Sequence, residues 1–236
     1  MGNVITRLAL PCPPCSYDLT LSYLNFIYVS DDYVIPIREY YWDANLPTML
    51  MCHANGEDHG RLNIKRLCHL YHVNMITFDY SGYGMHSCRI ASEANCYKDV
   101  FAVYHYLSNK GIDNVIIYGR SIGTGVASHL AHHLCQQQIP CRLILVSAFK
   151  TVMTTIFNIW TPFDLFLTQL IAPMITCPTL LVNGCYDKVT DCNRCYELSQ
   201  LFPNSQFVSI LGAGHDDVFK YQAYDDALIQ FIHNKT

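Results

Sequence analysis

The sequence has little charge. Only 14% of its 236 residues are Asp, Glu, Lys or Arg, the formal net charge at pH 7 is −4, and the isoelectric point is near 6.2. A nucleic-acid-binding surface needs clustered basic residues, and no basic run occurs, so nucleic acid is not an expected partner. The sequence also lacks a long uninterrupted apolar run. Its most apolar stretch, residues 147–176, is interrupted by Pro162, Asp164 and Pro173 and therefore does not predict a membrane span.

A secretory signal peptide is missing as well, although the chain has 12 cysteines. The two features together predict free thiols in a reducing compartment rather than a disulfide framework. Cys12 with Cys15 and Cys192 with Cys195 have the C-x-x-C spacing of zinc ligands. These pairs stand at opposite ends of the chain, and the second falls on an expected helix. We therefore expect no metal site and no cofactor.

The sequence does contain a G-x-S-x-G pattern, Gly119 to Gly123, centred on Ser121. A β-branched apolar run at residues 114–118 precedes it, and a helix-compatible stretch at residues 124–138 follows it. A serine on a tight strand-to-helix turn presents its hydroxyl above the sheet, and the glycines leave room for that turn. The pattern alone arises by chance in roughly one chain in ten of this length, so the context carries the prediction. The alternative role for Ser121 is an ordinary helix N-cap.

An aspartate and a histidine follow the serine in the order of the α/β-hydrolase triad. Asp187 comes after an expected strand at residues 178–183, and His215 comes after a strand at residues 206–211 and a glycine-rich loop. In such a triad the imidazole takes the serine proton, and the carboxylate fixes the imidazole tautomer and stabilises the imidazolium. We predict Ser121 as the nucleophile, His215 as the base and Asp187 as the orienting acid.

Three other aspartates compete for the role of the acid. Asp187 is preferred because it comes three residues after a strand-ending glycine, where its side chain can still point back over the sheet edge. Asp191 is expected to cap the helix that follows it, and Asp216 or Asp217 to cap the last helix.

Apolar residues make up 51% of the chain, which is enough for one sizeable core. Eight strands are expected, at residues 26–30, 34–41, 48–53, 74–80, 115–118, 142–147, 178–183 and 206–211. Five helices are expected, at about residues 58–71, 92–110, 122–138, 191–202 and 217–234. The first strand pair has no room for a helix and should be antiparallel, whereas the other pairings should be parallel.

This alternation predicts an α/β protein with the α/β-hydrolase fold. The sheet should be mostly parallel, with about eight strands and helices on both faces, and the ligand should lie at the carboxyl ends of the strands. The expected organisation is an extended arm at residues 1–22, followed by one hydrolase domain at residues 23–236 without a large lid.

The chain resembles the serine hydrolases that remove palmitate from membrane-anchored proteins. The resemblance covers about residues 24–232, and its most specific segments are D-Y-S-G-Y-G at 79–84 and G-R-S-I-G-T at 119–124. The segments at 53–58 and 212–217 also match. The resemblance implies the same triad and a substrate that carries an acyl group. Two residues depart from the family pattern, namely Ala54, where the family has glycine, and Arg120, where it usually has a small or amide residue.

An oxyanion hole would complete the catalytic machinery. One donor should be the backbone N–H of Ile122, the residue after the nucleophile, at a helix N-terminus. The other should come from the loop after the third strand, and Asn55 is the expected residue. The alternative for residues 53–58 is a plain turn that ends in an N-cap.

Residues 147–176 contain more large apolar residues than one helix stripe needs. They are Ile156, Phe157, Ile159, Trp160, Phe163, Leu165, Phe166, Leu167, Leu170 and Ile171. An acyl groove or a membrane-facing lip is one interpretation, and a helix packed on the sheet is the other.

The N-terminus fits the N-myristoylation pattern M-G-x-x-x-[ST], with Gly2 as the acceptor. Cys12 and Cys15 follow as candidate palmitoylation sites. One acyl chain binds a membrane only marginally and a second stabilises the anchor, so we expect peripheral attachment to the cytoplasmic side of membranes, or a cytoplasmic protein without it.

The function expected from the sequence is therefore a serine hydrolase that cleaves acyl thioesters or esters and removes palmitate from S-acylated proteins. One alternative is a carboxylesterase or lipase for small esters or acylglycerols. The other is a binding protein that keeps the fold without turnover.

Overall fold

The computed structural model describes residues 6, 9–86, 89–156, 159 and 164–234. The chain folds into two compact units, which span residues 1–115 and 116–236. All eight expected strands are present, each within two residues of its expected ends.

The first unit contains four strands, in the order β1 (Leu24–Ser30), β2 (Tyr33–Tyr40), β4 (Asn74–Phe78) and β3 (Thr48–Cys52). The β1–β2 pair is antiparallel, as expected. The expectation that every later pairing is parallel is wrong for β2 and β4, which pair antiparallel. The connection from β2 to β3 is too short for a helical crossover, so the chain simply turns back there.

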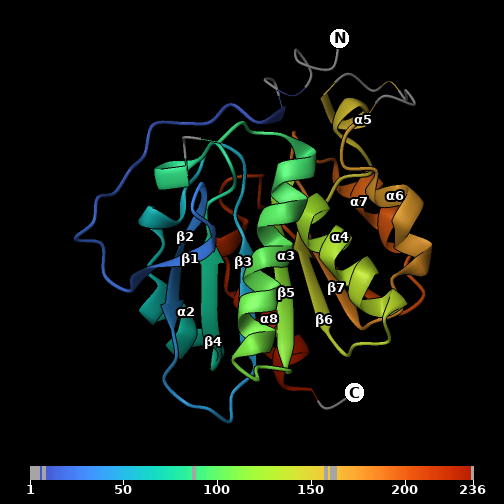
Figure 1. Ribbon diagram of the computed structural model, residues 1–236. Helices are drawn as coiled ribbons and strands as arrows, with labels where there is room; N and C mark the ends of the chain where they lie inside the picture. The colour runs from blue at the N-terminus through green and yellow to red at the C-terminus, as the bar shows by residue number, and fades with distance from the viewer. Residues whose placement is uncertain (1–5, 7–8, 87–88, 157–158, 160–163, 235–236) are drawn as a thin grey trace. The chain divides into compact units, whose positions relative to one another are not determined.

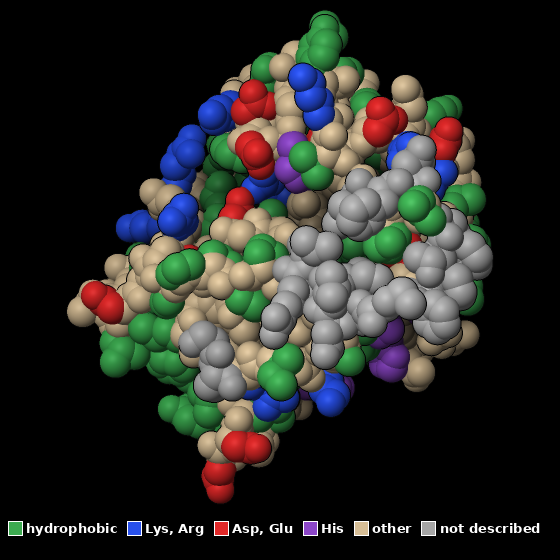
Figure 2. Space-filling view, turned by 90° about the horizontal axis from the view of Figure 1, so that it is seen from above, with side chains coloured by type: hydrophobic (Ala, Val, Ile, Leu, Met, Phe, Trp, Pro, Cys, Tyr) green, Lys and Arg blue, Asp and Glu red, His purple; other side chains and the backbone are tan. Residues whose placement is uncertain are grey.

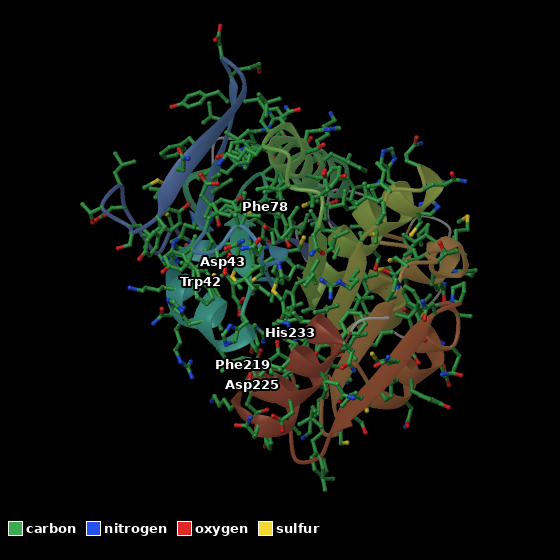
Figure 3. The ribbon with its side chains drawn as sticks, turned by 90° about the horizontal axis from the view of Figure 1, so that it is seen from below. Trp42, Asp43, Phe78, Phe219, Asp225 and His233 are labelled. Atoms are coloured by element: carbon green, nitrogen blue, oxygen red, sulfur yellow. The ribbon has the colours of Figure 1, made fainter. Side chains whose placement is uncertain are left out.

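That connection is fixed by Trp42, which Figure 3 labels beside Asp43. The Trp42 backbone N–H donates to the Asn74 Oδ1 atom over 3.0 Å, and its indole Nε1 donates to the Val73 carbonyl over 2.9 Å. Both acceptors lie at the start of β4. These two hydrogen bonds therefore hold the β2–β3 connection against the start of β4, the strand that pairs with β3.

Among the described residues, the first unit also contains the helical segments η1 (His59–Arg61), α2 (Ile64–Tyr71), η2 (Gly84–His86) and α3 (Glu93–Asn109). The single helix expected over residues 58–71 is therefore divided. Asp58 caps the short 3₁₀ turn and Asn63 caps α2 through the Arg66 N–H, so each polar side chain starts its own segment. In Figure 1, α3 lies on the near side of the unit's strands and α2 on the far side.

The second unit contains β5 (Val115–Arg120), β6 (Arg142–Val146), β7 (Thr179–Gly184) and β8 (Ser205–Ile210), paired in that order and all parallel. Its helices include α4 (Ile122–Gln136), α7 (Cys192–Ser199) and α8 (Gln222–His233). Helix α4 lies in front of β6 and β7 in Figure 1. A 3₁₀ turn, η4 (Val218–Lys220), precedes α8, so the last helix begins later than residue 217.

Burial along the strands explains this arrangement. Every residue of β3, β4, β5 and β7 is buried, whereas β1 and β8 are partly exposed. Strands covered on both faces need apolar residues along their whole length, which is the pattern of a parallel sheet between helix layers. The protein thus has the predicted eight-stranded, mostly parallel sheet with helices.

The apolar stretch at residues 147–176 forms α5 (Val152–Ile156), α6 (Thr168–Ile171) and η3 (Ala172–Met174). Phe166 is fully buried, and a Cβ added at Gly125 of α4 would come within 2.6 Å of its ring. Ile159 and Leu170 are 56% and 55% exposed. The stretch therefore combines packed and exposed apolar residues. Phe157, Trp160 and Phe163 lie outside the described residues.

The later part of the predicted arm packs on the first unit. The Ser16 backbone N–H donates to the Asp58 carboxylate over 2.6 Å, and the Tyr17 hydroxyl donates to the Asp79 Oδ2 atom. The division into an arm at residues 1–22 and a domain at residues 23–236 stays a prediction. In the part of the chain that the structure describes, no helix is both long and apolar enough to cross a membrane.

Candidate active site

The turn between β5 and α4 places Ser121 in an unusual backbone conformation, with φ +50° and ψ −120°. Non-glycine residues rarely adopt a positive φ, and such strain persists only where the surroundings fix it. Here the Ser121 N–H donates to the Val146 carbonyl over 2.9 Å, and the Ser121 carbonyl accepts from the Thr124 N–H and hydroxyl over 2.9 and 2.6 Å.

Gly119 makes this tight turn possible. A Cβ at Gly119 would lie 2.4 Å from the Gly123 carbonyl oxygen and 2.8 Å from the Ala127 Cβ. Any larger residue would push the start of α4 away from β5. The first glycine of the motif is thus required by the close approach of the helix to the strand.

The side chain of Ser121 does not act as a helix cap. Ser121 occupies the N-cap position of α4 but makes no side-chain cap hydrogen bond. Its Oγ atom lies 3.1 Å from the His215 Nε2 atom. The alternative N-cap role is therefore not the one that the geometry supports.

His215 connects the serine to Asp187. The His215 Nδ1 atom lies 2.8 Å from the Asp187 Oδ2 atom, so the structure brings together all three residues predicted for the triad. A carboxylate can only accept, so Nδ1 carries the proton and Nε2 presents its lone pair to the serine hydroxyl. This is the tautomer that a general base facing Ser121 needs.

Asp187 is held ionised by a set of donors. Its Oδ1 atom accepts the Val189 and Thr190 N–H groups, each over 2.8 Å, and its Oδ2 atom also accepts the Thr190 hydroxyl over 2.8 Å. Burial acts to raise the pKa of Asp187, but the hydrogen bonds from His215 and Thr190 outweigh it and lower the pKa. The carboxylate therefore stays charged when His215 gains a proton.

Thr190 is a functional residue that the sequence analysis missed. It supplies two of the donors to Asp187 through its N–H and its hydroxyl. An aspartate that accepts backbone N–H groups two and three residues further on forms a local turn of its own. The spacing Asp187-x-x-Thr190 was the available signal.

Arg120 also acquires a role from the structure. This buried side chain donates from Nη2 to the His215 carbonyl and to the Asp216 Oδ1 atom, both over 3.1 Å. Its guanidinium carbon lies 5.4 Å from the centre of the Phe219 ring, within cation–π range. The departure from the family pattern at this position thus ties the residue before the nucleophile to the loop that carries the base.

The competing aspartates have other roles. Asp191 caps α7, as predicted. The predicted cap of the last helix is wrong. Asp217 accepts the Gly214 N–H over 2.7 Å inside the histidine loop, Asp216 pairs with Arg120, and η4 separates both from α8. Their carboxylates are engaged locally before the last helix begins.

The two expected oxyanion donors lie in different units. Ile122 is the first residue of α4, where helix N–H groups lack partners within the helix. Asn55 follows β3 in the first unit, and its Oδ1 atom accepts the Tyr83 hydroxyl over 2.7 Å and the Gly56 N–H over 3.1 Å. That side chain is fixed in its loop. The oxyanion hole itself stays a prediction.

The candidate lipidation sites differ in exposure. Gly2 lies outside the described residues. Cys15 is exposed and Cys12 is half-buried.

Figure 2 looks onto the end at which the strands of the second unit finish, and hydrophobic side chains reach the surface there between charged side chains of both signs.

Comparison with known proteins finds a serine hydrolase family and α/β-hydrolase relatives. A family model described as serine hydrolase (FSH1) matches residues 77–216, more than half of the chain. The chain is 30% identical over 191 residues to alpha/beta hydrolase domain-containing protein aho-3 of Caenorhabditis elegans. This match covers 78% of this chain and 57% of that protein. It is 31% identical over 191 residues to human alpha/beta hydrolase domain-containing protein 17B, covering 78% and 66%.

Solved structures agree on the fold. Mouse alpha/beta hydrolase domain-containing protein 10 superposes with a TM-score of 0.67 at 17% identity, over 89% of this chain and 96% of that chain. A hydrolase from Pseudomonas aeruginosa superposes with a TM-score of 0.69 at 17% identity, over 90% and 99%.

The fold and the Ser–His–Asp arrangement define an α/β-hydrolase. The chain belongs to the serine hydrolase family described by the FSH1 model. The matched region covers 57% and 61% of the length of two of its curated relatives.

Proposed function

We propose that this chain hydrolyses acyl thioesters or esters, with Ser121 as nucleophile, His215 as base and Asp187 as orienting acid. The observation that carries the proposal is the continuous set of contacts from Ser121 Oγ through His215 to Asp187, at 3.1 and 2.8 Å. No cofactor takes part in the proposed reaction.

In the first half-reaction, His215 Nε2 takes the Ser121 proton while Oγ attacks the acyl carbonyl carbon. The carbonyl π electrons move to the oxygen, which the N–H groups of Asn55 and Ile122 would stabilise. The intermediate collapses, the bond to the thiol or alcohol breaks, and the imidazolium gives its proton to that leaving group. An acyl-serine remains.

In the second half-reaction, His215 takes a proton from water, and the hydroxide oxygen attacks the acyl carbon. Collapse of this intermediate returns the proton to Ser121 Oγ and releases the fatty acid. Asp187 stabilises the imidazolium in both steps because its donors keep it ionised. Arg120 positions the histidine loop by its bond to the His215 carbonyl.

The proposed substrate is an S-acylated protein with a long acyl chain, such as a palmitoylated protein. Support comes from the sequence resemblance to depalmitoylating hydrolases and from the exposed apolar residues Ile159 and Leu170 in the stretch after β6. Each buried CH₂ contributes about 0.8 kcal/mol, or about a fourfold gain in kcat/KM, if the groove holds it in the transition state.

The proposal includes a membrane location. Acylation of Gly2 together with Cys15 would hold the enzyme on the cytoplasmic side of the membrane that carries its substrates. Cys15 is the better second site because its thiol is exposed, whereas Cys12 is half-buried. Confinement to the same surface raises the encounter frequency without any change in the active site.

The nucleophile is tested with a fluorophosphonate probe. Wild-type protein should be labelled at Ser121, and Ser121→Ala should not be labelled. Ser209→Ala, which removes an exposed serine on β8, is the matched control and should label as the wild type does. Equal labelling of Ser121→Ala and the wild type would favour a binding protein with a hydrolase fold.

The substrate class is tested with acyl thioesters and p-nitrophenyl esters from acetyl to palmitoyl. We expect thioester kcat/KM to rise with chain length. Leu170→Ser should reduce that rise, and Leu211→Ser, an equally large and 78% exposed leucine after β8, should not. A preference for acetyl esters over every longer chain would indicate a small-ester carboxylesterase instead.

The location is tested by cell fractionation and intact mass. Gly2→Ala should move the protein to the soluble fraction, and Cys15→Ser should weaken attachment more than Cys12→Ser does. Both cysteine variants should keep full hydrolysis of soluble thioesters. Wild-type protein that is wholly soluble and carries no added mass would contradict the membrane location but not the hydrolase proposal.

A further inference from the structure

Three cysteine thiols meet in the second unit at the end where β6 and β7 begin, the end from which Figure 3 views the molecule. Cys135 lies in the last turn of α4, Cys141 directly precedes β6, and Cys177 comes just before β7. Each offers one sulfur, and these sulfurs all lie within 4.8 Å of one another. None of the three belongs to a C-x-x-C pair, so only the fold brings them together.

Regular backbone holds the three residues in place. Strands β6 and β7 pair in parallel from Leu143 and Thr179, close to the two cysteines that precede them. The turn from α4 is fixed by the Ile139 N–H, which donates to the Leu134 carbonyl over 2.9 Å. A binding site built on rigid elements is more exact than one on a loop, because its side chains start from fixed positions.

The three thiols differ in their exposure to solvent. Cys141 and Cys177 are buried, whereas Cys135 is half-buried. Solvent therefore reaches the cluster from the side of Cys135.

We propose that Cys135, Cys141 and Cys177 bind one thiophilic metal ion, Zn²⁺ or Cu⁺, through three thiolate sulfurs. Binding forms three metal–sulfur bonds and releases the thiol protons to solvent, with no change of oxidation state. Zinc–sulfur bonds of about 2.3 Å in a tetrahedron put the sulfurs about 3.8 Å apart, so little movement is needed. Water would take the fourth zinc position beside Cys135, whereas Cu⁺ is satisfied by three soft ligands.

The site is independent of the proposed hydrolysis. Ser121 precedes the first turn of α4 and Cys135 lies in its last turn, so a helix of about 22 Å separates the ion from the nucleophile. The ion would instead join α4, β6 and β7 at one point. Binding to the folded state alone would stabilise the second unit, whether or not the enzyme turns over.

The first test uses the full-length wild-type protein, fully reduced and freed of metal with a chelator. Titration with Zn²⁺, and separately with Cu⁺, against a competing chromophoric chelator should give one ion per chain for at least one of the two metals. Failure of both ions to bind in competition, or a disulfide between any two of the three cysteines that survives reduction, would overturn the proposal.

Protection from alkylation locates the ion without any variant. With the bound metal present, mass spectrometry should find Cys135, Cys141 and Cys177 unmodified, while the exposed Cys15 and Cys185 react as before. After the metal is removed, the half-buried Cys135 should react. Equal alkylation of Cys135 with and without metal would place the ion elsewhere and contradict the proposal.

Variants then test each ligand. Loss of a group that merely orients a metal ligand weakens binding about 10- to 100-fold, so Cys141→Ser and Cys177→Ser should each weaken it more than about 100-fold. Cys52→Ser, which removes an equally buried thiol in the first unit, is the matched control and should keep wild-type affinity. Metal affinity unchanged in both ligand variants would show that these thiols do not hold the ion.

Discussion

Asp187 in the second unit and Asp79 in the first are both buried aspartates beside histidines, yet their surroundings favour opposite charge states. They are 5% and 0% exposed. The pKa of Asp187 is lowered from its usual value, whereas burial raises the pKa of Asp79 to about 7. Burial alone therefore does not decide the state of a carboxylate in this protein.

The balance of burial, hydrogen-bond donors and neighbouring charge accounts for the difference. Asp187 accepts two backbone N–H groups, the Thr190 hydroxyl and the His215 imidazole, which together overcome burial. For Asp79, burial is the largest influence on its pKa. The hydrogen bonds from Tyr17 and from the His59 and Met85 N–H groups lower the pKa by less than burial and the nearby Asp58 carboxylate raise it.

The histidines beside Asp79 do not supply the missing charge. His59 Nδ1 and His53 Nε2 lie 3.7 and 3.9 Å from the Asp79 Oδ1 atom. Burial lowers the pKa of both imidazoles, so they are neutral at pH 7. An aspartate near a histidine is thus not sufficient for a triad. The donors around Asp187 distinguish the candidate triad pair from the Asp79 pair.

The largest expected effect comes from removing the charge of Asp187. Asp187→Asn keeps the shape but favours the wrong imidazole tautomer and leaves the imidazolium without its carboxylate, so kcat should fall about 10⁴-fold. Steady-state kinetics on a soluble thioester measures this. Asp191→Asn, which alters only the cap of α7, should leave kcat within about threefold and change stability by less than about 1 kcal/mol, because asparagine caps a helix about as well as aspartate. A larger kcat loss in Asp191→Asn would mean that the wrong acid was assigned.

The sequence was sufficient to predict that Ser121, His215 and Asp187 lie together, because its cues are local. The strand before Ser121 and the glycines of the motif stand in one short segment. Two further short segments give the order of the acid and the base. The same holds for the eight strands, whose apolar runs are short and separated by helical patterns. The roles of Thr190 and Arg120 depend on contacts between loops, with Asp187 and with the His215 carbonyl. No hydrophobic periodicity in the sequence predicts such contacts.

The reversed pairing of β2 with β4 was not predicted for a similar reason. Strand direction was inferred from whether a helix fits between two strands, a rule that covers neighbours in the chain only. The partner of β2 in space is β4, which lies beyond β3 and α2 in sequence. The three-thiol cluster was not predicted for the same reason. Its cysteines are far apart in sequence and come together only through the pairing of β6 with β7.

The second effect comes from the matching change at Asp79. Its folded pKa of about 7 exceeds the unfolded value of about 3.9, so this carboxyl contributes stability that is complete below pH 4 and is lost as pH rises through 7. Asp79→Asn cannot ionise. Relative to the variant, the wild type should lose about 3 kcal/mol of unfolding free energy between pH 5 and pH 8.

Urea unfolding at several pH values measures this difference, and the comparison with the variant cancels the titration of His53 and His59. Asparagine keeps an oxygen for the His59 N–H and offers an amide N–H to the Tyr17 oxygen, so the variant should fold. Parallel pH profiles for the two proteins would show that Asp79 is as ionised as Asp187. In that case the contrast between the two aspartates would fail.

A smaller effect is expected when Asp187 loses one of its donors. Thr190→Val removes the hydroxyl that donates to Asp187 Oδ2 and keeps the backbone N–H and the side-chain shape. A hydrogen bond to a charged group contributes about 1.5–3 kcal/mol, so kcat should fall about 10- to 100-fold. KM should stay unchanged, because Thr190 contacts the acid and not the substrate. Thr190→Ser, which restores the hydroxyl, should recover most of the rate, and a Ser variant as slow as Val would point to packing instead.

The smallest effect is expected at the ion pair between Arg120 and Asp216. The Asp216 side chain is 89% exposed, and exposed pairs contribute about 0.2–1 kcal/mol, so Asp216→Asn should change kcat by less than about fivefold. Arg120→Met removes the same pair and also the bond to the His215 carbonyl, so its kcat should fall further while KM stays constant. Thermal unfolding monitors whether each variant keeps its stability. If both variants lost the same activity at equal stability, the bond to the histidine loop would contribute nothing, and Arg120 would act only through its partner on the surface.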